Sequence, residues 1–104
     1  MIINGREIIV EDRFKRETIK IYRYYLKHTY QGAQKFLEDL RKIMQDRIAH
    51  YPTHHPEFIK LPTPGKVVRK ASFKKYYLIY RIEPTRLVFI SIFHFARDWQ
   101  KMRF

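Results

Sequence analysis

The chain has 104 residues, of which 45% are hydrophobic and 16% aromatic, and its formal net charge is +12 at pH 7. This length predicts a single domain, residues 1–104, and the hydrophobic content favours a packed core over disorder. The sequence contains no cysteine, which excludes disulfides, thiolate metal sites and cysteine nucleophiles. We find no signal peptide or membrane-spanning run, and we expect a soluble, cytoplasmic protein.

The first half of the chain predicts one strand and two helices. Residues 7–10 form a short run of mostly β-branched residues, which is typical of a strand. Apolar residues then recur at helical spacing over 12–28 and again over 33–51. The break between the two runs contains Gly32, a residue suited to a turn or a helix cap. Two helices joined by so short a link predict an antiparallel helical hairpin.

The second half predicts strands. Four prolines between 52 and 64 mark an irregular connection, because proline lacks a backbone donor and restricts the residue before it. Alternating patterns follow at 67–73, 76–82 and 87–95. Strict alternation along the last strand predicts that one face carries Val88, Ile90, Ile92 and His94. The predicted fold is α+β, of order β-α-α-β-β-β, with the hairpin packed on a three-strand antiparallel sheet.

Positive charge is concentrated in the predicted sheet. The last 45 residues hold 11 of the 22 Lys and Arg residues, against two acidic residues, Glu83 and Asp98. Lysine and arginine interleaved with Tyr and Phe suit a surface that neutralises phosphates and stacks bases. The alternative is a solvated strand face whose aromatic residues fill the core. For the cluster as a whole we expect an anionic partner.

Three residues near the end of the sheet could carry chemistry. Arg81 lies in an apolar strand, where a charge needs a partner. It could contact a phosphate or pair with an acid, Glu83, Asp98 or Glu57. His94 can act as an acid or a base, and Arg97 can stabilise a phosphorane-like transition state, which together suit RNA cleavage by a 2′-hydroxyl. The alternative roles are structural: strand-end hydrogen bonding by His94 and a local salt bridge between Arg97 and Asp98.

A metal site is disfavoured. His50, His54 and His55 lie close to Glu57, and the histidine spacing alone could hold an ion. However, they fall in or beside the proline-rich connection, and no further carboxylate or thiolate completes the set. We therefore predict no metal and no other cofactor.

Short motifs in the sheet half resemble those of the RelE/ParE superfamily of bacterial toxins. They are Tyr80-Arg81-Ile82 and the closing His94-x-x-Arg97-Asp98, and the likeness spans nearly the whole chain. The resemblance implies the toxin of a type II toxin–antitoxin module, of the kind associated with plasmid stabilisation. Its partner would be an acidic, partly disordered antitoxin, and the charge of +12 fits that independently because opposite potentials steer association.

The superfamily divides in mechanism. RelE-like members cleave messenger RNA on the ribosome, and ParE-like members inhibit DNA gyrase. By position, the cleaving residues would be Lys70, Arg81, His94 and Arg97, with contacts to nucleic acid or target from Arg69, Lys74 and Lys75. The ending of the chain resembles the ParE type, and Phe95 stands where cleaving relatives place a tyrosine. The sequence thus favours a gyrase inhibitor; the alternatives are a ribosome-dependent endoribonuclease and a basic RNA-binding module without toxicity.

Overall fold

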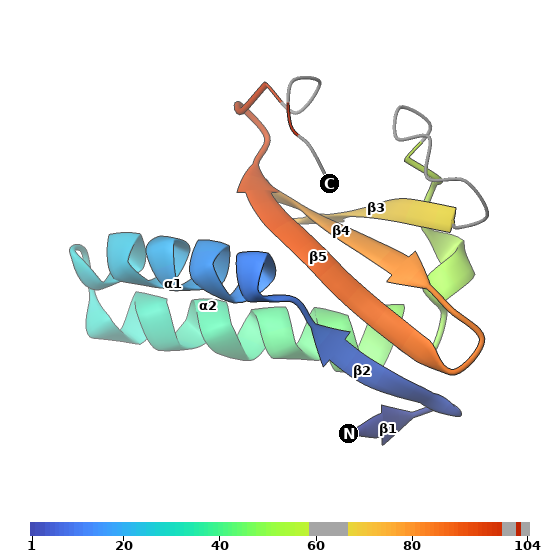
Figure 1. The fold of residues 1–104 in the computed structure, drawn as a ribbon. Helices are drawn as coiled ribbons and strands as arrows, with labels where there is room; N and C mark the ends of the chain where they lie inside the picture. Colours follow the sequence, from blue (N-terminus) through green and yellow to red (C-terminus); the bar gives the residue numbers. More distant parts are fainter. Residues whose placement is uncertain (59–66, 99–101, 103–104) are drawn as a thin grey trace.

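Two helices lie side by side across one face of a sheet, as Figure 1 shows for a computed structural model that describes residues 1–58, 67–98 and 102. The sheet has five strands in the order β1-β2-β5-β4-β3. The predicted α+β class is confirmed. The elements are β1 (Ile2–Ile3), β2 (Arg6–Val10), α1 (Asp12–Leu26), α2 (Tyr30–Lys42), the π-helical η1 (Ile43–Ile48), the 3-10 turn η2 (Pro52–His54), β3 (Val67–Phe73), β4 (Tyr76–Ile82) and β5 (Arg86–His94).

The sheet is mixed rather than purely antiparallel, which corrects the three-strand prediction. β3, β4 and β5 pair antiparallel as expected. In addition, β2 pairs in parallel with β5, from Glu7 opposite Arg86 to Val10 opposite Phe89. A short β1 pairs antiparallel with β2 through a turn at Asn4 and Gly5, whose φ angles of 52° and 81° are those that a tight hairpin turn requires. Local periodicity carries no information on the parallel pair, because its two strands are far apart in sequence.

A β-bulge in β5 makes the strict alternation predicted for this strand wrong. Ile79 pairs with Ser91 but Tyr80 pairs with Phe89, so Ile90 is an extra residue on the β5 side. The side chains before and after the bulge are therefore out of phase. The core beneath the helices receives Leu87, Phe89 and Ile92. The cluster on the outer face of the sheet receives Val88, Ile90 and Phe93.

The helical hairpin forms as predicted, with shifted ends. α1 ends at Leu26, and α2 begins at Tyr30 because the Thr29 side chain caps it by accepting a hydrogen bond from Gly32 N at 2.9 Å. Gly32 therefore lies in the first turn of α2, where an added Cβ would approach Thr29 Oγ1 to 2.7 Å. The second helical run continues as a π-helix over Ile43–Ile48 and ends earlier than predicted.

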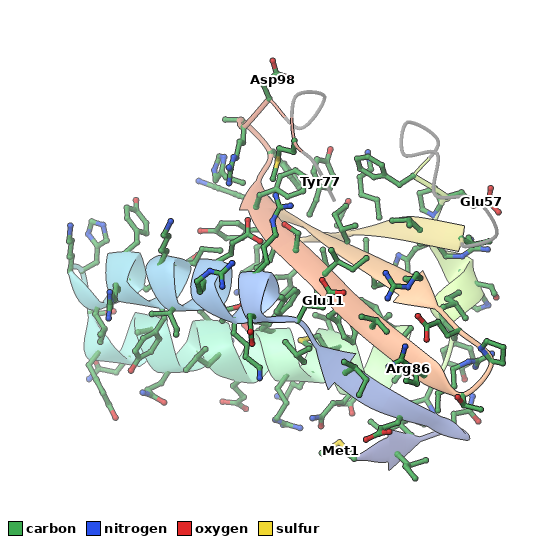
Figure 2. All side chains as sticks on the ribbon, in the orientation of Figure 1. Met1, Glu11, Glu57, Tyr77, Arg86 and Asp98 are labelled. Carbon is green, nitrogen blue, oxygen red and sulfur yellow. The ribbon has the colours of Figure 1, made fainter. Side chains whose placement is uncertain are left out.

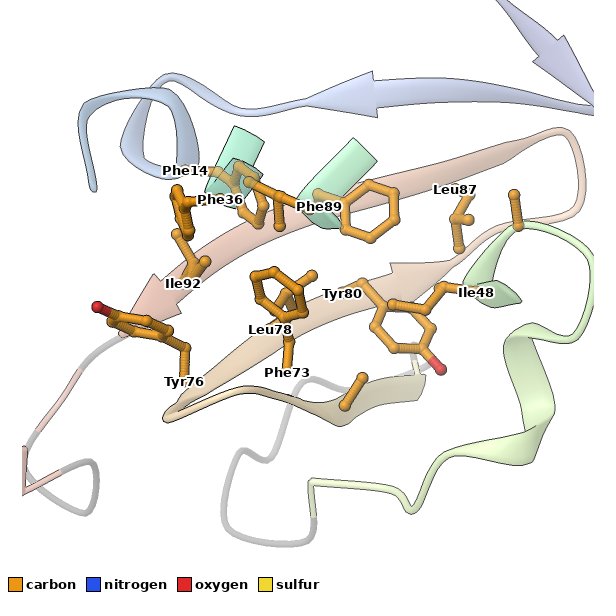
Figure 3. Close-up of a cluster of buried hydrophobic side chains, with 13 residues drawn as sticks. Phe14, Phe36, Ile48, Phe73, Tyr76, Leu78, Tyr80, Leu87, Phe89 and Ile92 are labelled. Atoms are coloured by element: carbon orange, nitrogen blue, oxygen red, sulfur yellow. The ribbon is translucent and has the colours of Figure 1, made fainter. Parts of the chain in front are cut away.

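The main core lies between the hairpin and the sheet. Figure 3 shows aromatic side chains from both layers pointing toward one another, with Phe14 of α1 and Phe89 of β5 at a ring-centroid distance of 5.7 Å. The smaller outer cluster includes Phe58 of the proline-rich connection and is contacted by Met102. Most of the predicted irregular connection, residues 59–66, lies outside the described part of the chain. Burial on both faces is why β4 and β5 read as nearly continuous apolar runs.

One buried hydrogen bond fastens the connection after η1 to the sheet. Tyr80 is fully buried, and its hydroxyl donates to the carbonyl oxygen of Pro52. Burial raises the pKa of the Tyr80 hydroxyl, so it remains a donor at any physiological pH.

Replacing this hydroxyl tests its contribution to stability. We expect Tyr80→Phe to lower the free energy of unfolding by roughly 1–3 kcal/mol, because the buried Pro52 carbonyl loses its partner. Urea denaturation measures the difference. Tyr51→Phe is the matched control, since Tyr51 is 57% exposed, and it should change stability by less than about 0.5 kcal/mol. Equal stability of Tyr80→Phe and wild type would contradict the assignment.

Candidate functional site

The predicted contact residue Arg69 and the predicted cleaving residue Lys70 both make contacts within the fold around β3. The Arg69 guanidinium donates to the carbonyl oxygen of His55 at 2.7 Å and pairs with Glu57 at 3.7 Å, and its side chain is 15% exposed. It thereby holds the segment after η2 against the sheet. The Lys70 ammonium lies over the ring of Tyr77, 4.4 Å from its centroid, on the outer face. Arg69 thus has a structural role in this fold, between β3 and the segment after η2.

Arg81 is engaged by carboxylates, as the structural alternative for its position in an apolar strand predicted. Its Nε donates to Glu83 at 2.8 Å, and a second nitrogen lies 3.9 Å from Glu11, which follows β2 (Figure 2). Glu83 also accepts from Arg86 at 2.7 Å. Hydrogen bonds from Arg81 and Arg86 hold the pKa of the Glu83 carboxyl below its usual value, so this cluster stays ionised.

His94 and Arg97 lie at the opposite end of β5. His94 is exposed, and its Nδ1 accepts a hydrogen bond from Ala96 N at 3.0 Å. Arg97 is paired with Glu17 of α1 at 3.6 Å, an interaction the sequence did not suggest. Glu17 also accepts a hydrogen bond from the fully buried Ser91 hydroxyl at 2.7 Å. A single carboxylate thus ties α1 to the bulge in β5 and to the arginine beyond it.

The four residues that a cleaving relative would use are not brought together. Arg81 pairs across β4 and β5 with Val88, whereas His94 pairs with Tyr76. Tyr76 and Arg81 are five positions apart in β4, about 17 Å along an extended strand. Arg81 and His94 also lie on different faces of the sheet. His94 pairs with Tyr76, which belongs to the core beneath the helices, whereas Arg81 follows the core residue Tyr80 and lies on the outer face. Arg81 and His94 are therefore too far apart for a hydrogen bond or a direct proton transfer between them.

A groove of about 760 Å³ opens between α1 and the β3–β4 turn. Its lining is aromatic and basic, and none of its members is acidic; they are Lys20, Ile21, Tyr24, Tyr25, His28, Lys74, Lys75, Tyr76 and His94. The groove brings together three of the residues predicted from sequence, His94, Lys74 and Lys75. The role of α1 as the other wall of the groove was not predicted from the sequence. Its signal was present as Lys20, Tyr24 and His28, spaced four residues apart and therefore on one face of a helix.

The β3–β4 turn that forms one wall of this groove is held in place from α2. Lys74 has a φ of +54°, a conformation that is uncommon for residues other than glycine. Its ammonium pairs with Asp39 at 2.9 Å, and the same contact lowers the pKa of the Asp39 carboxyl. This ion pair fixes the turn and so the position of Lys75 beside it.

The histidines at 50, 54 and 55 do not assemble a metal site. His54 stacks on Tyr51 with ring centroids 5.0 Å apart. His55 contacts the buried Tyr80 edge-on, and burial lowers the pKa of its imidazole. Across residues 1–58, 67–98 and 102, no group of three His, Cys, Asp or Glu side chains could hold a metal ion.

Comparison with known proteins identifies the family. The sequence matches, over residues 8–99, the family described as ParE toxin of type II toxin-antitoxin system, parDE. The chain belongs to the ParE toxin family. This confirms the predicted RelE/ParE superfamily. No significant match is found among curated protein sequences.

A solved structure shares the ParE-like fold. A chain of the chromosomal ParDE TA system from P. aeruginosa matches with a TM-score of 0.68 at 13% sequence identity. The match covers 86% of this chain and 96% of that chain. In the described part of the chain, no helix combines the length and the apolar character that crossing a membrane requires.

The Glu83 cluster predicts a pH dependence of stability. Because the pKa of Glu83 is lowered in the folded chain, its contribution is present above the ordinary value of 4.5 and is lost as pH falls through the lowered pKa. Glu83→Gln removes the contribution at every pH. The stability difference between wild type and Glu83→Gln should therefore be largest near neutral pH and narrow as pH falls from about 5 to about 3. Thermal melts at a series of pH values measure it, and a constant difference would argue against the cluster.

Proposed function

We propose that this protein is a single-domain, cytoplasmic toxin that arrests growth by binding DNA gyrase and not by cleaving RNA. Membership of the ParE family supports this reading, because the resemblance to ParE-like members implies gyrase inhibition. The observation that carries it is the disposition of the cleavage candidates. Arg81 is bound by Glu83, Arg97 is bound by Glu17, and His94 lies at the far end of the sheet from Arg81.

We further propose an acidic antitoxin as the partner that neutralises the toxin. The net charge of +12 supports an anionic partner, because opposite potentials accelerate encounter. The helical hairpin also leaves large apolar side chains exposed that a partner could cover, namely Ile19, Tyr24, Leu26 and Tyr30. An antitoxin segment that folds onto this hairpin would bury apolar surface and bring its carboxylates to the basic side chains of α1.

Induction in bacteria separates the gyrase reading from RNA cleavage. We expect growth arrest with double-strand DNA breaks and an SOS response, while primer extension finds cellular messages intact. The same purified protein should inhibit supercoiling by gyrase in vitro. Cuts at ribosomal A-site codons that disappear in Arg81→Lys and His94→Ala variants would instead establish the endoribonuclease. Normal growth with folded protein present would leave the RNA-binding module as the correct reading.

The charge argument predicts a salt-dependent complex. Affinity for the antitoxin should fall as NaCl rises from about 0.05 M to about 0.5 M, because the Debye length shortens several-fold over this range. Titration calorimetry of the purified pair measures it. Replacing the exposed Arg23 by Gln should reduce the salt dependence, whereas the change Gln34→Ala, which removes no charge, should leave it unaltered. An affinity that is independent of salt would refute the electrostatic contribution.

A further inference from the structure

We propose that the groove between α1 and the β3–β4 turn binds a nucleobase that carries a phosphate. This proposal does not depend on the gyrase binding proposed above. The inference rests on three features of the groove: paired aromatic rings on both walls, lysines at its rim without carboxylate partners, and walls that offer no backbone for a peptide to pair with.

Each wall presents a tyrosine and an imidazole in edge-to-face contact. On the α1 wall, Tyr24 and His28 have ring centroids 5.1 Å apart at an interplanar angle of 71°. On the sheet wall, Tyr76 and His94 are 5.6 Å apart at 89°. Tyr24 is 57% exposed and His94 is also exposed, so flat ring surface is accessible from the groove. Aromatic surfaces of this kind stack nucleobases with little dependence on base identity.

Tyr76, the buried ring of the sheet-wall pair, also forms the floor of the groove. It is 7% exposed, and burial raises the pKa of its hydroxyl to about 12. The floor therefore carries no negative charge near neutral pH, and it does not repel a phosphate. The groove as a whole offers apolar contact at its base and positive charge around it.

Two lysines at the rim are available to an anion. Lys74 is already paired with Asp39. Among the described residues, neither Lys20 of α1 nor Lys75 of the turn forms an ion pair with a carboxylate. They line opposite walls, so a phosphate at the mouth of the groove would be contacted from both sides. Lysine binds phosphate as a point charge, without the geometric demands of a bidentate arginine.

The walls disfavour an extended acidic peptide as the occupant. α1 has its backbone groups satisfied within the helix, and β4 is hydrogen-bonded on both sides by β3 and β5. Neither wall therefore offers the row of free backbone groups through which a peptide adds to a sheet. A stacked base needs no such row, because it is held by ring surfaces.

Titrating the purified, full-length protein with AMP tests the proposal, with binding followed by NMR chemical shifts. Saturable shifts are expected at Tyr24, Tyr76 and His94. Tyr24→Leu should weaken AMP binding about tenfold through loss of stacking, with inorganic phosphate binding unchanged. Lys20→Gln and Lys75→Gln should each weaken both ligands. Lys15→Gln, on α1 but outside the groove, is the charge-matched control.

A second nucleotide probe and a peptide competitor identify the source of the ligand and give the outcomes that would refute the proposed site. A 5′-phosphorylated RNA hexamer that binds more tightly than AMP, with the same shifts, would assign the site to a nucleic-acid end; equal affinity would assign it to free nucleotides. No saturable binding of either probe would overturn the proposal. AMP affinity that is unchanged in Tyr24→Leu and Lys75→Gln would also overturn it. A third contrary outcome is a glutamate-rich peptide that displaces AMP and binds wild type and Tyr24→Leu equally well. Unchanged thermal melts would show that all variants remain folded.

Discussion

The parallel pairing of β2 with β5 is the contact on which the rest of the arrangement depends. It makes β5 an interior strand, which is why nearly all of its side chains are buried. It also fixes where the chain leaves the sheet, since Glu11 N donates to Phe89 O at 3.0 Å immediately before α1 begins. From that starting point α1 runs beside the C-terminal half of β5 and places Glu17 against Ser91. The ion pair with Arg97 and the α1 wall of the groove both follow from this direction of exit.

Carboxylates determine what the basic residues of this protein can do. Although cations outnumber acids by 22 to 10, the acids lie where they restrain particular arginines. Glu83 holds Arg81 and Arg86 at one end of the sheet, and Glu17 holds Arg97 at the other. Among the described residues, two lysines of the groove, Lys20 and Lys75, form no ion pair with a carboxylate. The protein thus separates cations that maintain the fold from cations that face solvent, and the net charge alone does not reveal this division.

Local patterns in the sequence predicted the bounds of β3 and β4 to the residue, because each strand-forming run ends at a turn or a proline-containing connection. Alternation failed to predict the faces of β5, where the extra residue Ile90 shifts the phase without any change in composition. The candidate site was likewise predicted only in part. His94, Lys74 and Lys75 were found as basic residues near strand ends, but their neighbours on α1 and the partner of Arg97 were not. Ser91 and Glu17 are 74 residues apart, and no local pattern encodes a contact of that range.

The edge of the sheet at β3 has a consequence for the free toxin. The segment Pro56–Phe58 covers this edge, with Phe58 N donating to Val68 O and Lys70 N donating to Pro56 O. An uncovered strand edge is a template on which other chains can add, and such growth leads to aggregation. The short cover over β3 occupies backbone groups that would otherwise recruit further copies, and so favours a free toxin that stays dispersed.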